Sequence, residues 1–300
     1  MAFRWIGKSK DGNTVTLKRL EGCPIVKPLY YSDSYASSIW LKTNPDQVRI
    51  GAVLDIETTG LNQNEDLIIE IAIKQFLFNR ISGEILDVRK SYTSFQDPGM
   101  PLPPKIIEIT GITNEMVVDK HIDWSQVDII LDECSLMIAH NARFDRSFID
   151  KKSKISKDKI WACTYKHIDW NNKGYNSSKL ELLNIYHGFF TDSHRAMNDV
   201  DALLYLLSLK DENSNSPYLL EMLNNARRPM TQIIASSAPF ESKDRLKERG
   251  YNWDAIHRFW SKIIFKDEMA DEIQWLEADV YQGLFGGLTR DISLSDNFKN

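Results

Sequence analysis

The sequence of 300 residues lacks any long hydrophobic run. Its apolar stretches, such as residues 68–73 and 203–207, are far too short to span a bilayer. The N-terminus, M-A-F-R-W-I-G-K-S-K, lacks the apolar segment of a signal peptide. The cysteines, at positions 23, 134 and 163, are odd in number and widely spaced, so they indicate neither a disulfide framework nor a zinc site. We therefore expect a cytoplasmic protein.

An excess of positive charge is also absent, because the formal net charge is −5 at pH 7. Proteins that bind nucleic acid through a broad surface are usually basic, so any contact with a phosphate backbone must be local. The hydrophobic content of 42% is enough for one sizeable core and a second small one.

A regular alternation of strands and helices begins at residue 49. Apolar patterning predicts strands at residues 50–57, 67–78, 84–95, 136–139 and 161–165, and helices at residues 105–109, 114–118, 144–151, 179–186 and 196–209. This order predicts an α/β domain over residues 49–210, with helices on the faces of a mixed sheet. Residues 1–48 form an N-terminal extension, in which K-D-G-N predicts the turn of a hairpin.

The composition changes after residue 210. D-E-N-S-N-S-P is typical of a linker, and Ser216 followed by Pro217 is a helix start signal, so residues 211–229 are predicted to be a linker and a helix. Strands at 231–235 and 258–265, with helices at 242–249 and 267–278, predict a small α+β domain over residues 230–285. The polar residues 286–300 are expected to form a flexible tail.

Acidic residues stand at the ends of two predicted elements. Asp55 and Glu57 are two apart on a strand, so their side chains leave the same face and would repel unless a cation lay between them. D-x-E alone is a short motif, and a solvated sheet edge is its commoner explanation. Here the pair ends an apolar strand and precedes T-T-G, a loop that lets backbone approach a ligand. Asp145 lies near a helix start, where an acidic residue is commonly a cap or a dipole partner.

His194 and Asp199 are five residues apart, about 140° around a helix, and do not share a helical face. We expect Asp199 inside the helix and His194 on the loop before it, although a lone histidine is more often simply a surface residue. Asp201 follows Asp199 by two and points elsewhere, so we exclude it.

Together these segments resemble the motifs of the DnaQ-like 3′–5′ exonucleases, in the subgroup called DEDDh. D-I-E-T-T-G-L resembles the first motif, A-H-N-A-R-F-D the second and H-R-A-M-N-D the third. P-L-P-P-K-I-I-E-I-T-G-I-T and S-K-L-E-L-L-N-I-Y resemble segments between them. Each motif is weak alone, but their order is specific, and the resemblance covers roughly residues 49–210. It implies a ribonuclease H-like fold with a mixed five-stranded sheet.

The resemblance also implies a chemistry. Two Mg²⁺ or Mn²⁺ ions would be held by Asp55, Glu57, Asp145 and Asp199, and would stabilise the attacking and leaving oxygens of an in-line displacement. His194 would be the general base that activates the water, since histidine titrates near neutrality. The product would be a nucleoside 5′-monophosphate released from a 3′ end.

Further positions match family residues that bind substrate. Thr58 by its backbone and Leu61 as an apolar wedge would contact the terminal nucleotide, and Asn141 and Phe144 would position the strand. Core packing is the alternative for Leu61 and for Phe144. His140 lies in the second motif, and we interpret it as structural.

The substrate class stays open between two nucleic acids. We favour single-stranded DNA or frayed 3′ ends, and the alternative is an RNA 3′–5′ exonuclease of the RNase T or oligoribonuclease type. A third hypothesis, from another class, is a non-catalytic nucleic-acid or protein-interaction module, against which the complete set of carboxylates argues.

The C-terminal domain combines basic residues with aromatic ones, in K-D-R-L-K-E-R-G-Y-N-W-D and R-F-W-S-K. Such a combination can bind single-stranded nucleic acid, but in a small domain the aromatics more commonly form the core. Residues 282–285, Q-G-L-F, resemble the Q-x-x-L-F peptides that bind bacterial sliding clamps, but they are one residue short and coincidence is favoured. Contact with a clamp or a polymerase is therefore only weakly indicated.

Overall fold

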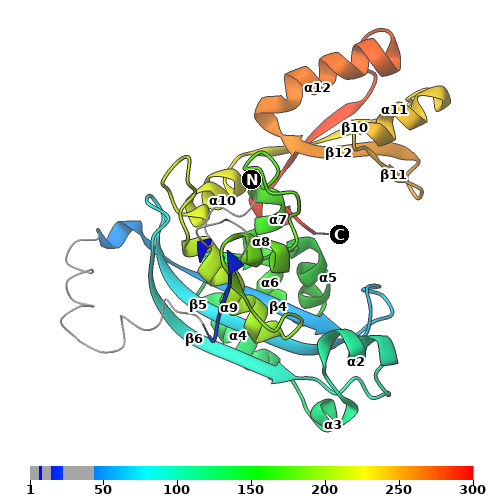
Figure 1. The fold of residues 1–300 in the computed structure, drawn as a ribbon. Helices are drawn as coiled ribbons and strands as arrows, with labels where there is room; N and C mark the ends of the chain where they lie inside the picture. The colour runs from blue at the N-terminus through cyan, green and yellow to red at the C-terminus, as the bar shows by residue number, and fades with distance from the viewer. Residues whose placement is uncertain (1–6, 9–14, 23–43, 300) are drawn as a thin grey trace. The chain divides into compact units, whose positions relative to one another are not determined.

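The computed structural model describes residues 7–8, 15–22 and 44–299. The chain divides into two compact units, Met1–Ala226 with Phe298–Asn300, and Arg227–Asn297 (Figure 1). No helix among the described residues is long and apolar enough to cross a membrane. In the N-terminal extension, β1 (Gly7–Lys8) and β2 (Val15–Thr16) pair antiparallel on either side of the expected turn. Much of the rest of the extension, including Cys23, lies outside the described residues.

The first unit is built on a mixed five-stranded sheet in the order β6-β5-β4-β7-β8. Three antiparallel strands come first in the chain, β4 (Val48–Thr58), β5 (Ile68–Asn79) and β6 (Ile85–Phe95). Two short strands then add in parallel beside β4, namely β7 (Leu136–Ala139) and β8 (Trp161–Cys163). The predicted fold class and its five strands are confirmed.

Helices cover both faces of this sheet (Figure 1). The core on one face includes residues of α8 (Leu180–Tyr186), α9 (Ala196–Ser208) and α10 (Tyr218–Ala226). The core on the other includes residues of α4 (Trp124–Asp132) and α5 (Ala142–Lys152), and α4 was not predicted. Along β4, Val53 belongs to the α9 side and Leu54 to the α5 side. Side chains alternate along a strand, so Asp55 and Glu57 face α9.

Shorter elements complete the unit. The predicted helices before and after Gly111 are α2 (Pro104–Thr110) and α3 (Asn114–Val117), and Gly111 ends α2 with φ 67°. α6 (Lys154–Asp158) and α7 (Thr164–His167) flank β8. β3 (Lys18–Arg19) pairs in parallel with β9 (Phe189–Phe190), which attaches the extension to this unit.

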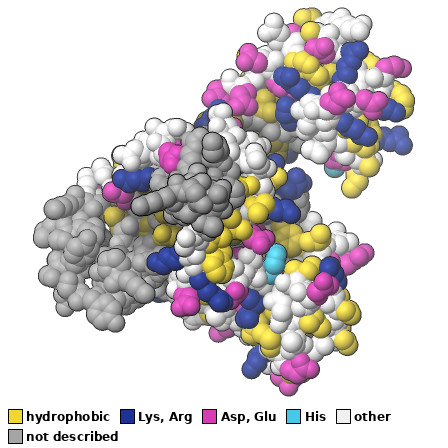
Figure 2. All heavy atoms as spheres, viewed as in Figure 1, with side chains coloured by type: hydrophobic (Ala, Val, Ile, Leu, Met, Phe, Trp, Pro, Cys, Tyr) yellow, Lys and Arg dark blue, Asp and Glu magenta, His cyan; other side chains and the backbone are white. Residues whose placement is uncertain are grey.

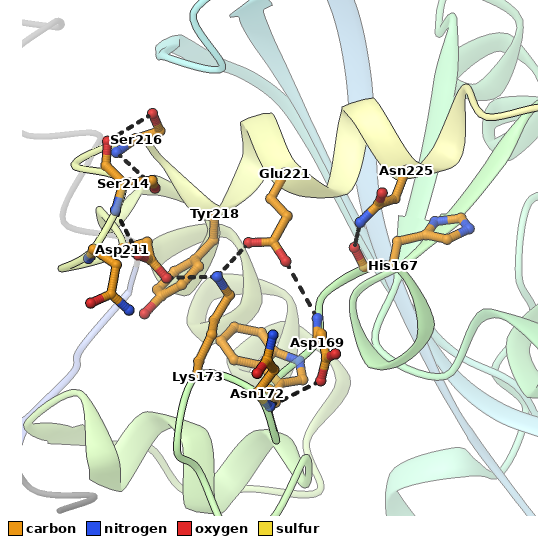
Figure 3. A network of polar contacts seen from close by, with 12 residues as sticks. His167, Asp169, Asn172, Lys173, Asp211, Ser214, Ser216, Tyr218, Glu221 and Asn225 are labelled. Carbon is orange, nitrogen blue, oxygen red and sulfur yellow. Dashed lines mark hydrogen bonds and ion pairs between the residues drawn. The ribbon is translucent and has the colours of Figure 1, made fainter. Parts of the chain in front are cut away.

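The predicted boundary at residue 210 is wrong, because α10 belongs to the first unit. Tyr218 and other apolar residues of α10 are buried in the same core as α9. Figure 3 shows the polar contacts that accompany this packing: the Lys173 ammonium lies 2.6 Å from carboxylate oxygens of both Asp211 and Glu221. The Asn225 amide donates to the carbonyl of His167 at 2.8 Å. The segment after residue 210 is therefore a docked part of the unit.

The second unit is a four-stranded antiparallel sheet with helical segments. Its elements in chain order are β10 (Met230–Ala235), α11 (Lys243–Glu248), β11 (Asn252–Asp254), β12 (Phe259–Phe265), α12 (Met269–Trp275), the helical turn η5 (Leu276–Tyr281) and β13 (Leu288–Ile292). The expected flexible tail is wrong over β13, which pairs with β10 from Met230 to Ile234. Backbone pairing orders this segment although its own side chains are mostly exposed.

Candidate active site

The first two predicted site residues lie at the end of β4. Asp55 is paired in register with Ala72, and Glu57 with Glu70, on the neighbouring strand β5. The pairing shifts between Glu57 and Thr58, a bulge that ends the regular ladder. An apolar strand thus carries two carboxylates to the point where the chain leaves the sheet, on the face covered by α9.

Helix α9 brings a third carboxylate to this point. Asp199 lies in the first turn of this helix, and the helix packs over β4 and β5. Carboxylate oxygens of Asp55, Glu57 and Asp199 all lie within 4.8 Å of one another. Asp199 is more than 140 positions from the other two residues in the sequence, so the fold brings it to them.

Asp145 lies beside this group without being part of it. It occupies the first turn of α5 and is only 3% exposed. Its carboxylate accepts a hydrogen bond from the backbone of Ile56, the residue between Asp55 and Glu57. It is also close enough to raise the pKa of Asp55. All four predicted acids therefore converge on the end of β4.

His194 lies on the loop that leads into α9, as expected, and its side chain is exposed. Its backbone has φ 65°, an uncommon left-handed conformation for a residue with a side chain. The backbone N–H of His194 donates to Oδ2 of Asp199 at 2.9 Å. Among the described residues, its imidazole has no hydrogen-bond partner. The loop is thus tied to Asp199 by its main chain, and the ring is available.

Burial and mutual repulsion make the acids hard to ionise together. Burial, with the charges of Asp145, Asp199 and Glu57, raises the pKa of Asp55 well above its ordinary value. Burial and the neighbouring Asp199 and Glu70 raise the pKa of Glu57 to about 8. Burial also raises the pKa of Asp145 and of Asp199 to about 7. A cation among these groups would stabilise their charged forms.

Glu70 is a fifth acid at the site, and sequence reasoning missed it. It is 2% exposed and faces Glu57 across the strand pair. Its carboxylate accepts from Arg195 Nη2 at 3.1 Å and from the backbone N–H of Ala196 at 3.1 Å. These contacts join β5 to the first residues of α9. The sequence feature that could have identified Glu70 is that it is the single acidic residue inside the apolar run I-I-E-I-A-I.

The sequence model of a protein family described as Exonuclease (RNase_T) matches residues 52–207. The chain belongs to this family. The matched residues include Asp55, Glu57, Asp145 and Asp199, and the match confirms the resemblance to the DnaQ-like exonucleases. The expectation of an enzyme of the nuclease class is confirmed with it.

Relatives and solved structures resemble parts of this exonuclease family member. It is 33% identical over 178 residues to the PolC-type DNA polymerase III of Bacillus cereus and 34% identical over 172 residues to that of Bacillus subtilis. Each match covers 53% of this chain, and the chain spans only 11% of either relative. Exonuclease X with 5′ overhanging duplex DNA is 23% identical over 57% of this chain and 99% of that one, with a TM-score of 0.40. E. coli Exonuclease I in complex with a dA16 oligonucleotide is 15% identical, and the match covers 72% of this chain and 63% of that one, with a TM-score of 0.48.

Thr58 and Leu61 lie in the loop of the exonuclease domain that follows β4. Thr58 is buried, and its hydroxyl donates to the carbonyl of Gly60 at 2.5 Å, which shapes the loop. Leu61 is 86% exposed. The core-packing alternative for Leu61 is therefore wrong, and its side chain is available for contact with another molecule.

The residues predicted beside Asp145 differ in their surroundings. Asn141 is exposed at the start of α5. Phe144 packs against the core on the α5 side, with its ring centroid 5.1 Å from that of Phe148, so it has a structural role. His140 bonds to Thr164 Oγ1 at 2.9 Å and to the carbonyl of Ser178 at 2.7 Å. Burial lowers the pKa of His140 to about 4, in agreement with its structural interpretation.

Two other residues lie apart from the acidic group. Asp201 points away from it and forms an ion pair with Lys74 of β5. In the segment resembling a clamp-binding peptide, Phe285 packs against the core of the second unit, while Leu284 is 90% exposed. A clamp-binding peptide would have to release Phe285 from that core, which favours coincidence.

Proposed function

We propose that this chain is a divalent-metal-dependent 3′–5′ exonuclease that releases nucleoside 5′-monophosphates from the 3′ ends of single-stranded DNA. One observation carries this proposal. Carboxylate oxygens of Asp55, Glu57 and Asp199 lie within 4.8 Å of one another, in a domain that matches the exonuclease family. The proposed attacking species is a water molecule, activated by the cations that these carboxylates would hold.

The donor set supports a hard cation. Asp55, Glu57 and Asp199, with Asp145 beside them, offer only oxygen ligands, the type that suits Mg²⁺ and Mn²⁺. Burial raises the pKa of each acid, with neighbouring carboxylates adding to the effect at Asp55, Glu57 and Asp199, and a bound cation would stabilise the charged forms. Two such ions, when bound, would neutralise charge on the attacking and leaving oxygens of the phosphodiester.

His194 is the proposed general base. Its exposed ring stands on the loop before α9, and its backbone is anchored to Asp199. A proton from the attacking water would pass to this imidazole and then to solvent. Because the backbone N–H of His194 is bonded to the Asp199 carboxylate, the proposed general base is held near one of the proposed metal ligands.

The substrate proposal rests on two observations. Leu61 presents an exposed apolar side chain in the loop that follows β4, the strand of Asp55 and Glu57, and we assign it the role of a wedge against the terminal base. The curated relatives are named as DNA polymerases, which favours DNA. On the face drawn in Figure 2, cationic and anionic side chains are interspersed over both units, which supports a local contact with phosphates.

The test uses 5′-labelled DNA and RNA strands of the same sequence. With Mg²⁺ or Mn²⁺, the protein should shorten DNA into a ladder, a chelator should stop it, and Asp199→Ala should be inactive yet folded. Faster shortening of RNA would replace the DNA proposal with the RNA one. No shortening of either strand would overturn the proposed enzyme.

A further inference from the structure

The second unit has a strand and helix order of its own. Its elements follow one another as β10-α11-β11-β12-α12-β13, and its sheet has the order β11-β12-β10-β13. This is the βαββαβ arrangement, in which the first and third strands occupy the centre of the sheet. Modules that bind single-stranded RNA through an exposed sheet face share four strands arranged in this way.

Both helices cover the same face of the sheet. Leu246 of α11 and Ile273 of α12 pack in one core with Ile233, Ala235 and Ile264. Alternation places the next residues along each strand on the opposite face. The apolar members of that face are Met230, Ile234, Phe259, Ile263, Phe265, Leu288 and Ile292. Met230 is buried, and the other six are partly buried or exposed.

This open face, defined by those seven residues and by Arg290, is accessible. Ile263 is 51% exposed and Leu288 is 65% exposed. In the register of the sheet, Ile263, Gln232 and Arg290 form one row across three strands. An aromatic residue, Phe259, lies on the same face at the start of β12 and is only partly buried. The open face thus combines apolar side chains with one cation.

Charge is distributed unevenly between the two faces. Most carboxylates of the unit lie on its helical segments, namely Glu241, Asp244, Glu248, Asp267, Glu268, Asp271, Glu272, Glu277, Asp279 and Asp296. On the strands, Asp291 faces the helices and pairs with Lys266. Asp254 shares the open face, but it already accepts from His257 Nδ1 at 2.8 Å. Within the described residues, Arg290 has no carboxylate partner, so the open face is suited to an anion.

Aromatic rings at this face already stack on cationic or titratable groups. The His257 ring lies 5.8 Å from that of Phe259, at an interplanar angle of 21°. The Arg228 guanidinium lies 3.6 Å from the centroid of Phe265, while Asp267 accepts from the same group. Nucleobases stack on aromatic rings in a similar way, whatever their sequence.

We propose that the open face of the second unit binds single-stranded nucleic acid, with bases on Phe259 and Ile263 and phosphates near Arg290. The proposal rests on the proposed function, which supplies a strand as substrate. The basic helix α11, on the other face, is not the binding element.

The test measures strand binding in the full-length chain with Asp199→Ala, so that strands stay intact. Fluorescence anisotropy is followed with labelled oligothymidylate and oligouridylate. Ile263→Glu and Arg290→Glu, both at exposed positions, should each raise Kd by about tenfold. Lys247→Glu, an equal charge reversal at an exposed position of α11, should leave Kd unchanged.

A second measurement separates this proposal from the nuclease reaction. With Asp199 intact, hydrolysis of the p-nitrophenyl ester of thymidine 5′-monophosphate should be equal in Lys247→Glu and in the unaltered protein. Absence of that hydrolysis would count against the proposed function alone, since binding is measured separately. Unchanged strand affinity in both face variants would overturn the binding face, as would an equal loss in Lys247→Glu. A face variant that alters only the oligomeric state would instead assign the face to a second copy.

Discussion

Arg195 and Glu70 form an ion pair of 3.1 Å that joins the start of helix α9 to strand β5. Glu70 is almost fully buried and lies opposite Glu57, so two acids face one another directly. Like charges in this position destabilise a sheet. Arg195 offsets them, because it also lowers the pKa of Glu57. The pair therefore positions the segment that carries His194 and Asp199.

Glu70→Gln is expected to lower kcat by roughly 10–100-fold, the usual effect of losing a partner that orients a site. Gln keeps an acceptor for Ala196 but loses the charge, so Glu70→Ala should be more severe. Kinetics on a labelled strand at saturating metal would measure this. Glu108→Gln is the matched control, because its ion pair with Lys105 is 70% exposed on both sides. Full activity of Glu70→Gln would remove this positioning role.

His194→Ala is expected to lower kcat by roughly 10²–10⁴-fold with little change in KM, because the general base acts in the chemical step. His121→Ala, at another exposed histidine of the same unit, is the control and should be unaffected. Steady-state kinetics on both variants checks the difference. Equal activities of the two variants would exclude His194 as the base.

The acidic group should make the metal-free protein less stable as the pH rises. The acids have ordinary pKa values of 3.8 or 4.5, whereas in the folded state the pKa of Glu57 is about 8 and that of Asp199 about 7. At a pH between the ordinary pKa and the raised pKa of these acids, the folded chain holds protons that the unfolded chain has released. The free energy of unfolding therefore falls as the pH increases.

Thermal unfolding of the chelated protein would measure this trend between about pH 5 and about pH 8. Glu57→Gln should weaken the trend and stabilise the metal-free protein at the upper pH by roughly 1–2 kcal/mol. Mg²⁺ or Mn²⁺ should restore stability there, since a cation replaces the protons. A melting temperature that rises with pH in the chelated protein would contradict the repulsion described for these acids.

Lys173→Met should destabilise the first unit by about 2–3 kcal/mol, because it leaves Asp211 without its cation. Asp211 is only 5% exposed, and Lys173 is 16% exposed. Lys105→Met removes an exposed ion pair instead and should cost less than about 0.5 kcal/mol. Denaturant unfolding of both variants tests whether α10 is held by this network. Equal stability of the two variants would mean that the apolar packing of α10 suffices.

Local patterns predicted much of this molecule and failed where pairing partners decide the structure. The apolar run before Asp55 predicts a buried strand ending in acids, and the structure contains it. Glu70 was missed because its importance depends on the register of β5 against β4, which no local pattern specifies. β13 was missed because L-T-R-D-I becomes a strand only beside β10. The helix α10 was predicted but grouped with a linker outside the first domain, because its contacts with Lys173 are distant in sequence.

The most direct measurement follows one DNA strand labelled at both ends, with Mg²⁺ and the full-length protein. The 3′ label should be released first, as a nucleoside 5′-monophosphate, while the 5′ label stays on a strand that becomes shorter. Asp55→Asn should abolish both the release of the 3′ label and the shortening. Release of the 5′ label first, cleavage inside the strand, or equal activity of Asp55→Asn would contradict a metal-dependent 3′–5′ exonuclease.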